Sequence, residues 1–334
     1  MLPVMILDGR MNVWQFSVRT CFGHVIWLGV LGVFLNVSAC AGLSQPSSHF
    51  EVGQLFDLRQ GGVTSIETLT QDLLNVDVVY IGEEHYNPSH IQIATQILEM
   101  LRNRGHHPAL AMEMLSWDGQ AALNQWVVGA LADDQFVHVS HWEENWGGQY
   151  ENYQPLVTLA RAHRFPLYAL NPPRPLVRKI ATMGLEAGLA DPAMQSWNLP
   201  HNISLDDPDY QNVIYEQIVQ CHTNLPQHVY QRIYEASIFR DAGMAKIIVD
   251  YLESKPESKG PLVSYTGGGH IQYNIPIPQR VQTRTARTVE QITIYLMALD
   301  PAREEDIYEA MHNHVADYLW LTPLGPDGPQ PRCG

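Results

Sequence analysis

The sequence predicts an α/β protein with a mostly parallel sheet flanked by helices. A smaller helical subdomain is predicted before the last of four motif-bearing strands. Each of these strands is a short apolar segment that runs directly into polar residues, which are Gly82–His85, Glu113, Asn171 and Gly267–His270. Because the carboxyl ends of parallel strands line one crevice, we expect these four groups to converge on one site.

The strand predictions rest on apolar runs bounded by Gly and Pro. The four motif-bearing strands are predicted at residues 76–81, 108–114, 165–170 and 261–266, and two more at residues 291–299 and 317–321. Helix-length segments separate the motif-bearing strands, which is typical of parallel pairing with helices on both faces.

The clearest helix prediction covers residues 89–104. Pro88 suits a first helical position and Gly105 suits the end. The apolar face is predicted from the spacing of Ile91, Ala94, Ile97, Leu98 and Leu101. Residues 185–260 lack strand signals and form the predicted helical subdomain, with a long helix at 226–252 and a position suited to covering the crevice.

Composition places limits on the partners. The chain has 334 residues, is 45% hydrophobic and carries a formal net charge of -15. Such a chain can bury a large core. No run of Lys and Arg occurs in the sequence. The prediction is therefore no nucleic-acid partner and no attachment to anionic lipid by charge alone.

The N-terminal segment has the features of an export signal. Arg10 and Arg19 precede an apolar stretch at residues 25–35, and small residues then lead to Cys40. This pattern resembles a bacterial lipobox, in which the Cys becomes the lipidated first residue. An ordinary signal peptide or an uncleaved anchor is the alternative, and Met11 is an alternative start. The predicted boundaries are 1–39 for the signal, 40–54 for the lipidated Cys and tether, 55–322 for the domain and 323–334 for a disordered tail.

Two cysteines remain after the signal and Cys40 are set aside. Export permits a disulfide between Cys221 and Cys333, although disulfide geometry is demanding. Their pairing stays open at this point.

The two GxxH turns are the strongest candidates for chemistry. His85 and His270 each follow a glycine by three positions at a strand end, where each suits a metal ligand or a general base. Glu83, Glu84 and Glu113 can complete the coordination of a divalent metal. The alternative is that the carboxylates cap helices and the glycines serve turns.

Other candidates carry weaker signals. Asn171 precedes Pro-Pro-Arg and also suits a turn or a helix cap. Arg240 and Asp241 lie within a helix, where charged residues most often face solvent. An aromatic-rich stretch at residues 137–153 fits core packing as well as a ligand wall.

These pieces together resemble the ChaN family of haem-binding lipoproteins in the Tiki superfamily. The matching segments, in chain order from about residue 57 to 281, are GEEHYNPSH, AMEM, WGGQYENYQPLVTLARAHRFPLYALNPPR, RDAGMA and GGGHIQYNIPIPQRV. Tyr86 stands where the family more often has a small polar residue. The ordered set is more specific than any one segment.

The resemblance implies haem binding through a Tyr ligand, by a homodimer that holds two haems face to face. Tyr150, Tyr153 and Tyr273 are the candidate ligands, with Tyr86 also beside a His turn. Arg174, and also Arg240, would meet the haem propionates. A role in iron uptake at the outer membrane, on its periplasmic or surface face, with a haem or iron receptor as partner, is also implied.

The wider superfamily implies a different use of the same strand ends. There, His85, Glu113 and His270 would serve a metal-dependent hydrolase, with Glu83 and Asp241 as further metal ligands. An inactive scaffold that retains a vestigial site is the third alternative.

Overall fold

A computed structural model describes residues 49–199, 203–254 and 260–329 of the chain. The expected signal segment, Cys40 and Cys333 lie outside these residues. Cys221 is disulfide-bonded, and its pairing with Cys333 stays a prediction.

One eight-stranded sheet organises the described residues, in the order β2-β1-β8-β7-β3-β6-β4-β5. The strands are β1 (Leu55–Asp57), β2 (Gly62–Val63), β3 (Val78–Glu83), β4 (Ala109–Ser116), β5 (Leu167–Asn171), β6 (Leu262–Gly267), β7 (Gln291–Ala298) and β8 (Tyr318–Thr322). All neighbours are parallel except β1, which is antiparallel to β2 and to β8. The predicted α/β class with a mostly parallel sheet is confirmed.

The four motif-bearing strands lie side by side as β3-β6-β4-β5. Because all three pairings are parallel, their carboxyl ends reach one stretch of the sheet edge. The observed strands begin within two residues of the predicted positions. Strands β1 and β2 were not predicted; they are only 3 and 2 residues long and pair at the other edge of the sheet.

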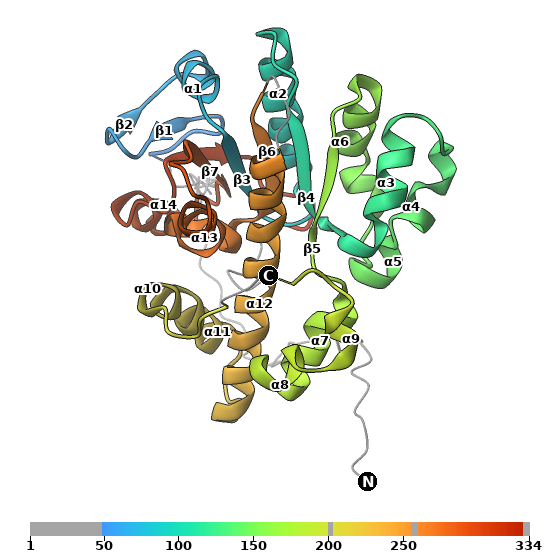
Figure 1. Cartoon of the computed structure of the whole chain (residues 1–334). Helices are drawn as coiled ribbons and strands as arrows, with labels where there is room; N and C mark the ends of the chain where they lie inside the picture. Colours follow the sequence, from blue (N-terminus) through green and yellow to red (C-terminus); the bar gives the residue numbers. More distant parts are fainter. Residues whose placement is uncertain (1–48, 200–202, 255–259, 330–334) are drawn as a thin grey trace, which may run out of the picture. The chain divides into compact units, whose positions relative to one another are not determined.

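Helices cover the sheet and build the subdomain (Figure 1). The helices before the subdomain are α1 (Ile66–Leu73), α2 (Pro88–Asn103), α3 (Gln120–Val127), α4 (Phe136–Val139), α5 (Trp142–Asn145), α6 (Tyr150–His163) and α7 (Arg174–Met183). The later ones are α8 (Leu185–Leu189), α9 (Pro192–Gln195), α10 (Pro208–Tyr210), α11 (Glu216–Cys221), α12 (Gln227–Ser254), α13 (Arg280–Arg284) and α14 (Glu304–His312).

The start of α2 is fixed by local sequence. The side chain of Asn87 accepts a hydrogen bond from the backbone N–H of Ser89 at 3.0 Å, and Pro88 occupies the first turn. Both features are standard at helix N-termini. Helix α2 therefore starts directly after the first GxxH turn. Its predicted apolar face is buried against the sheet.

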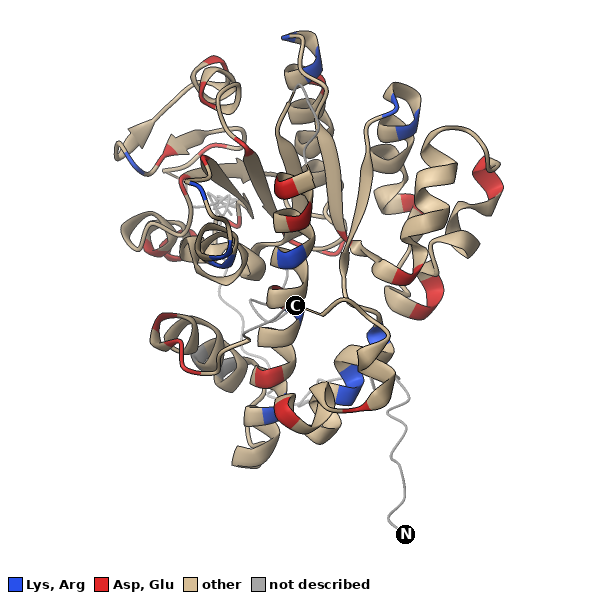
Figure 2. Ribbon diagram, viewed as in Figure 1, with Lys and Arg blue, Asp and Glu red and all other residues tan. Residues whose placement is uncertain are grey.

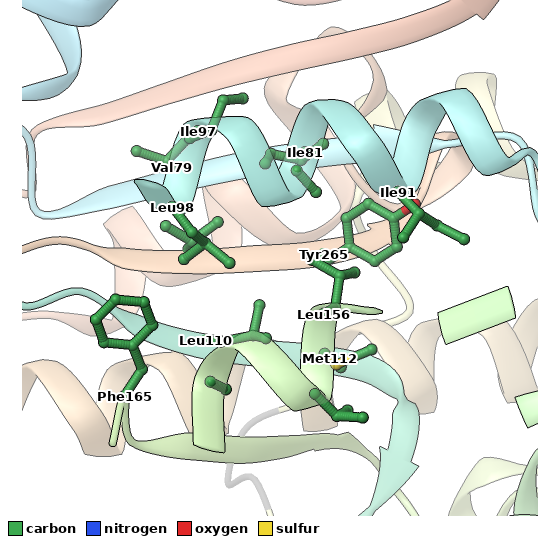
Figure 3. Packing of buried hydrophobic residues seen from close by; sticks show 14 of the residues in the cluster. Val79, Ile81, Ile91, Ile97, Leu98, Leu110, Met112, Leu156, Phe165 and Tyr265 are labelled. Carbon is green, nitrogen blue, oxygen red and sulfur yellow. The ribbon is translucent and has the colours of Figure 1, made fainter. Parts of the chain in front are cut away.

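Strand alternation divides the core between the two faces of the sheet. In β3, Val79 and Ile81 pack toward α2 and α6, whereas Val78 and Tyr80 pack toward α12. Figure 3 shows the first of these layers, where strand side chains meet Leu98 of α2 and residues of α6. Alternate side chains along a strand therefore reach opposite layers, and we call this dependence on odd or even position the strand parity.

The long helix α12 carries both the sheet packing and the subdomain. Residues such as Met244 and Ile248 in its second half pack on the sheet. Its first half contacts α7 and α8 through Phe239 and α10 through Tyr234. Figure 1 shows α7–α9 and α10–α11 on opposite sides of this half of α12. Residues 185–254 form helices without a strand among the described positions, as predicted.

Packing extends beyond the predicted domain boundaries at both ends. Phe50 is buried, with its ring centroid 6.0 Å from that of Phe56 and 4.9 Å from that of Tyr308. At the other end, Asn87 donates its side-chain amide to the carbonyl of Pro323 at 3.2 Å. Ordered contacts therefore include residues that the sequence assigned to the tether and the tail.

Charged residues are distributed over many helices and loops rather than over one element (Figure 2). Among the described residues, no helix is both long enough and apolar enough to span a bilayer.

Candidate functional site

The site has two halves, set by strand parity. Glu83 of β3 follows Val79 and Ile81 at even spacing and therefore faces the α2 and α6 layer. Glu113 of β4 follows Ala109 and Ala111 and therefore faces the α12 layer. Both carboxylates are nearly inaccessible to solvent, at 4% and 1% exposure.

In the first half, Glu83 accepts three hydrogen bonds. Tyr153 and Tyr265 donate their hydroxyls at 2.7 Å and 2.5 Å, and Nδ1 of His85 donates at 2.8 Å. Burial raises the pKa of Glu83, while these donors act in the opposite direction. For His85, burial alone would lower the pKa, but the bond to Glu83 and the charge of Glu113 leave it raised.

In the second half, Glu113 joins three elements. Its Oε2 accepts the backbone N–H of Gly267 in β6 at 2.8 Å. Its Oε1 accepts from Arg240 of α12 at 2.5 Å and lies 3.2 Å from Nε2 of His270. Burial opposes ionisation, yet the charges of His270 and Arg240 hold the pKa of Glu113 well below its usual range. Glu113 is therefore an ionised carboxylate in a buried ion-pair cluster.

Asp241 continues this cluster into the subdomain. Its Oδ1 lies 2.5 Å from Nδ1 of His270, and its Oδ2 accepts the hydroxyl of Tyr210 of α10 at 2.5 Å. Arg280 stacks over the Tyr210 ring with its guanidinium carbon 4.0 Å from the centroid. Burial would lower the pKa of His270, but Glu113 and Asp241 raise it to about 9.

Gly267 separates the two halves. A Cβ placed on it would lie 2.9 Å from Cε1 of His85 and 3.6 Å from Oε2 of Glu113. A Cβ at this position would force the His85 ring to move, so glycine allows His85 to approach the end of β6 as closely as it does. The two GxxH turns are thus brought together, as expected for neighbouring parallel strands.

Two further motif residues serve the fold instead. Nδ1 of His90 accepts the backbone N–H of Glu84 at 2.9 Å, and its Nε2 lies 2.8 Å from the hydroxyl of Thr322. Burial lowers the pKa of His90 to about 3, so it is neutral. The carboxylate of Glu84 accepts from the backbone N–H of Ala298 at 3.0 Å. Both residues tie the first GxxH turn to β7 and β8.

An aromatic rim borders His85. The ring of Trp146 meets that of His85 edge-on at 5.0 Å between centroids, and the Tyr86 ring lies 6.3 Å from each. Tyr86 is 37% exposed and adopts a φ of 66°, unusual for a bulky residue. Its backbone N–H donates to the hydroxyl of Tyr153 at 3.2 Å. Tyr86 also fills the space beside Gly148, where a Cβ would lie 2.2 Å from its hydroxyl.

The other predicted haem residues lie elsewhere. The Tyr150 ring stacks on Phe136 at 5.2 Å, and burial raises its pKa to about 12. Tyr273 packs against the cluster formed by β8, α14 and their neighbours. Arg174 is exposed at the start of α7, where its backbone N–H donates to Asn145 at 2.9 Å. The structure does not bring these three into the hydrogen-bonded network around Glu83 and Glu113.

Most of the predicted metal ligands form hydrogen bonds or ion pairs with one another. Within residues 49–199, 203–254 and 260–329, no group of three or more His, Cys, Asp and Glu is arranged to hold a metal ion. The oxygens of Glu83, Glu113 and Asp241 instead accept hydrogen bonds from protein donors.

Two hollows lie near the site. One has a volume of about 50 Å³ and is lined by His85, Tyr86, Asn87 and residues 325–327. The other is a groove of about 440 Å³ between α2 and α6, which begins at Pro88 and includes Glu151. The hollow beside His85 is much smaller than the roughly 300–1,000 Å³ of a typical ligand cavity.

Sequence reasoning missed two buried tyrosines. Tyr265 lies two residues before Gly267 on β6, so strand alternation alone could have placed it beside Glu83. Tyr210 lies in the subdomain, and nothing in its local sequence indicates contact with Asp241.

Comparison with known proteins defines the class of this α/β chain. The family model described as "Haem-binding uptake, Tiki superfamily, ChaN" matches residues 69–281, which is more than half of the chain. The chain therefore belongs to the ChaN family of haem-binding uptake proteins in the Tiki superfamily. No curated protein matches it.

A solved structure shares the fold of this chain. The structure described as "Cofacial heme binding to ChaN of Campylobacter jejuni" is 17% identical, covers 80% of this chain and 95% of its own, and has a TM-score of 0.61. The type III effector HopBA1 is 14% identical over 77% of this chain and 92% of its own, with a TM-score of 0.43.

The raised pKa of His270 predicts a pH-dependent stability. Because the folded pKa is about 9 and the ordinary value is 6.5, the stabilisation is complete below pH 6.5 and is lost as the pH rises to about 9. Urea unfolding should show a free energy of unfolding that falls over this range. His270→Gln should flatten the fall, whereas the same substitution at exposed His138 should leave it unchanged. Equal slopes for wild type and His270→Gln would contradict the ion-pair cluster.

Proposed function

We propose that this chain binds haem on the aromatic rim formed by His85, Tyr86 and Trp146, with Tyr86 as the iron ligand. Membership of the haem-binding family supports the ligand. The observation that carries the assignment is the exposed phenol of Tyr86 beside two further rings. Tyrosine is an established ligand of ferric haem, and flat rings suit packing against a porphyrin.

The other tyrosines are less suited to this role. The hydroxyl of Tyr153 is buried, donates to Glu83 and accepts from the backbone of Tyr86. Tyr150 is stacked on Phe136, and Tyr273 is packed beside β8. Iron at Tyr86 would require no break in these contacts. The ring of His85 lies edge-on to Tyr86, with 6.3 Å between the ring centroids, and adds a further flat surface beside the proposed ligand.

We also propose that two copies of the chain enclose the haem. The hollow at Tyr86 holds only about 50 Å³, so one copy would leave a bound porphyrin largely exposed to water. A second copy would bury the apolar faces that remain. The cofacial haems named for the Campylobacter jejuni ChaN structure are compatible with such a pair.

We propose a cellular role in haem or iron uptake from features of the sequence. Cys40 after its apolar segment favours an exported lipoprotein anchored at the outer membrane. There it would act in haem or iron uptake together with an outer-membrane receptor. For the hydrolase alternative, the internal hydrogen bonds of Glu83 and Glu113 leave less capacity for a metal, so haem binding is the better supported function.

A haemin titration tests the iron ligand. Wild-type residues 41–334 should give saturable visible spectra of tyrosine-ligated ferric haem. Tyr86→Phe should lose those bands and weaken binding about tenfold or more, which corresponds to ~1.4 kcal/mol or more. Tyr150→Phe is the matched control and should bind as wild type does. Loss of the bands in Tyr150→Phe but not in Tyr86→Phe would reject the assignment.

The dimer is tested by sedimentation velocity. Addition of one equivalent of haemin per chain should shift the protein from monomer to dimer. Tyr86→Phe at the same haemin concentration should remain mostly monomeric. A saturated haem complex that sediments as a monomer would exclude enclosure by two copies.

The anchor is tested in a bacterial host that expresses the full chain. Wild type should incorporate labelled fatty acid and fractionate with membranes, because lipid chains provide the attachment. Cys40→Ser should abolish the label. Cys333→Ser is the control and should retain it. An unlabelled wild-type protein would contradict lipidation at Cys40.

A further inference from the structure

Unsatisfied hydrogen-bond donors lie beside the buried carboxylates. Arg240 donates from Nη2 to Glu113 and from Nε to the side-chain oxygen of Asn171 at 3.3 Å. Its Nη1 and the amide nitrogen of Asn171 have no partner among the described residues. In His85, Nδ1 contacts Glu83 and Nε2 likewise has no partner there. These three nitrogens are left available to a ligand.

The three nitrogens belong to one locality. Oε2 of Glu113 and Nε2 of His85 lie 3.6 Å and 3.1 Å from the same point, the position of a Cβ on Gly267. Arg240 contacts the other oxygen of Glu113 at 2.5 Å. Glu113 thus lies between His85 and Arg240, and Asn171 adjoins Arg240 at the end of the neighbouring strand.

Exposure separates the donors from the acceptors. The side chains of His85 and Arg240 are 32% and 30% exposed, whereas those of Glu83 and Glu113 are 0% and 1% exposed. An incoming group therefore meets nitrogen donors, and the carboxylates beneath them are already hydrogen-bonded. In a chain of net charge -15, such a local donor surface is a specific feature and not a consequence of overall charge.

We propose that Arg240, Asn171 and His85 form a binding subsite for a carboxylate. The planar guanidinium of Arg240 matches the two oxygens of a carboxylate. The Asn171 amide adds a neutral donor with a fixed direction, because its oxygen is held by Arg240. Arg240 is thereby shared between a structural carboxylate, Glu113, and the carboxylate of a ligand.

The ligand group is a propionate of haem, an assignment that rests on the proposed function. His85 joins the two regions, since its ring contacts the Tyr86 and Trp146 rings and also adjoins Gly267. Iron at Tyr86 and a carboxylate at Arg240 would then position one molecule at two points. Arg174, the other cation suggested by the sequence, is exposed at the start of α7 and makes no ion pair with Glu113 of the kind that Arg240 makes.

The first experiment changes the ligand and leaves the protein intact. Haemin and its dimethyl ester, in which both propionates are blocked, are titrated into wild-type residues 41–334. A hydrogen bond between charged groups corresponds to about a tenfold to hundredfold difference in affinity. The ester should bind more weakly by this factor. Equal affinities would overturn the subsite.

The second experiment assigns the effect to one residue. Arg240→Lys keeps the charge beside Glu113 but removes the planar fork, so the fold is expected to be retained. In this variant the preference for haemin over its ester should shrink to about twofold or less. The matched substitution Arg174→Lys should keep the wild-type preference. If the preference for haemin over its ester persists in Arg240→Lys and disappears in Arg174→Lys, the propionate binds at Arg174 of α7 and the proposed subsite is rejected.

A third measurement separates this inference from the proposed function. The side-chain NMR signals of Arg240 and Asn171 are followed during titration with acetate in the absence of haem. If acetate gives saturable shifts but the protein does not bind haem, the carboxylate subsite would be supported with a free carboxylate as its ligand. The proposed haem function would then be rejected and the subsite retained. Haem binding without acetate shifts and without an ester effect would retain the function and reject the subsite.

Discussion

The arrangement of this protein depends on the buried, ionised carboxylate of Glu113. Its partners come from the backbone of β6, from α12 and from the turn after β6. Removing one partner of a buried charge typically costs about 3–5 kcal/mol, because the remaining charge is left without compensation. The sheet, the long helix and the second GxxH turn must therefore occupy fixed relative positions for Glu113 to be tolerated.

Glu83 follows the same principle on the opposite face of the sheet. Two tyrosine hydroxyls and one imidazole satisfy its oxygens. In each half one nitrogen donor is partly exposed beside a buried carboxylate, His85 beside Glu83 and Arg240 beside Glu113. Together with the rings of Tyr86 and Trp146, these donors form a surface suited to a flat anionic ligand.

The motif at residues 82–90 combines two roles that sequence comparison alone does not separate. His85 is partly exposed and contacts the rings of Tyr86 and Trp146, whereas His90 is neutral, buried and hydrogen-bonded to Glu84 and Thr322. Asn87 caps α2 and also contacts Pro323. A histidine in a recurring motif is therefore informative only when its partners are known, since the same residue type serves a binding surface and the packing of a strand end.

Local patterns determined most of the architecture. The alternation of apolar residues, the lengths of the helical segments and the Gly and Pro boundaries predicted six of the strands, the parallel pairing and the helical subdomain. The short β1 and β2 were missed because 3 and 2 residues carry no periodic signal, and their pairing depends on β8 from the far end of the chain.

The sequence by itself determined that Glu83, His85, Glu113 and His270 would meet, because polar residues at the ends of parallel strands share one edge. Only the tertiary structure decided their partners. Strand parity sends Glu83 and Glu113 to opposite faces. Helix α12 brings Arg240 to Glu113, which is more than one hundred residues away in the chain. The same helix brings Asp241 into contact with His270 and Tyr210. The tertiary structure also decided that Tyr86 is exposed while Tyr153 is buried, because burial depends on neighbours that are distant in the chain.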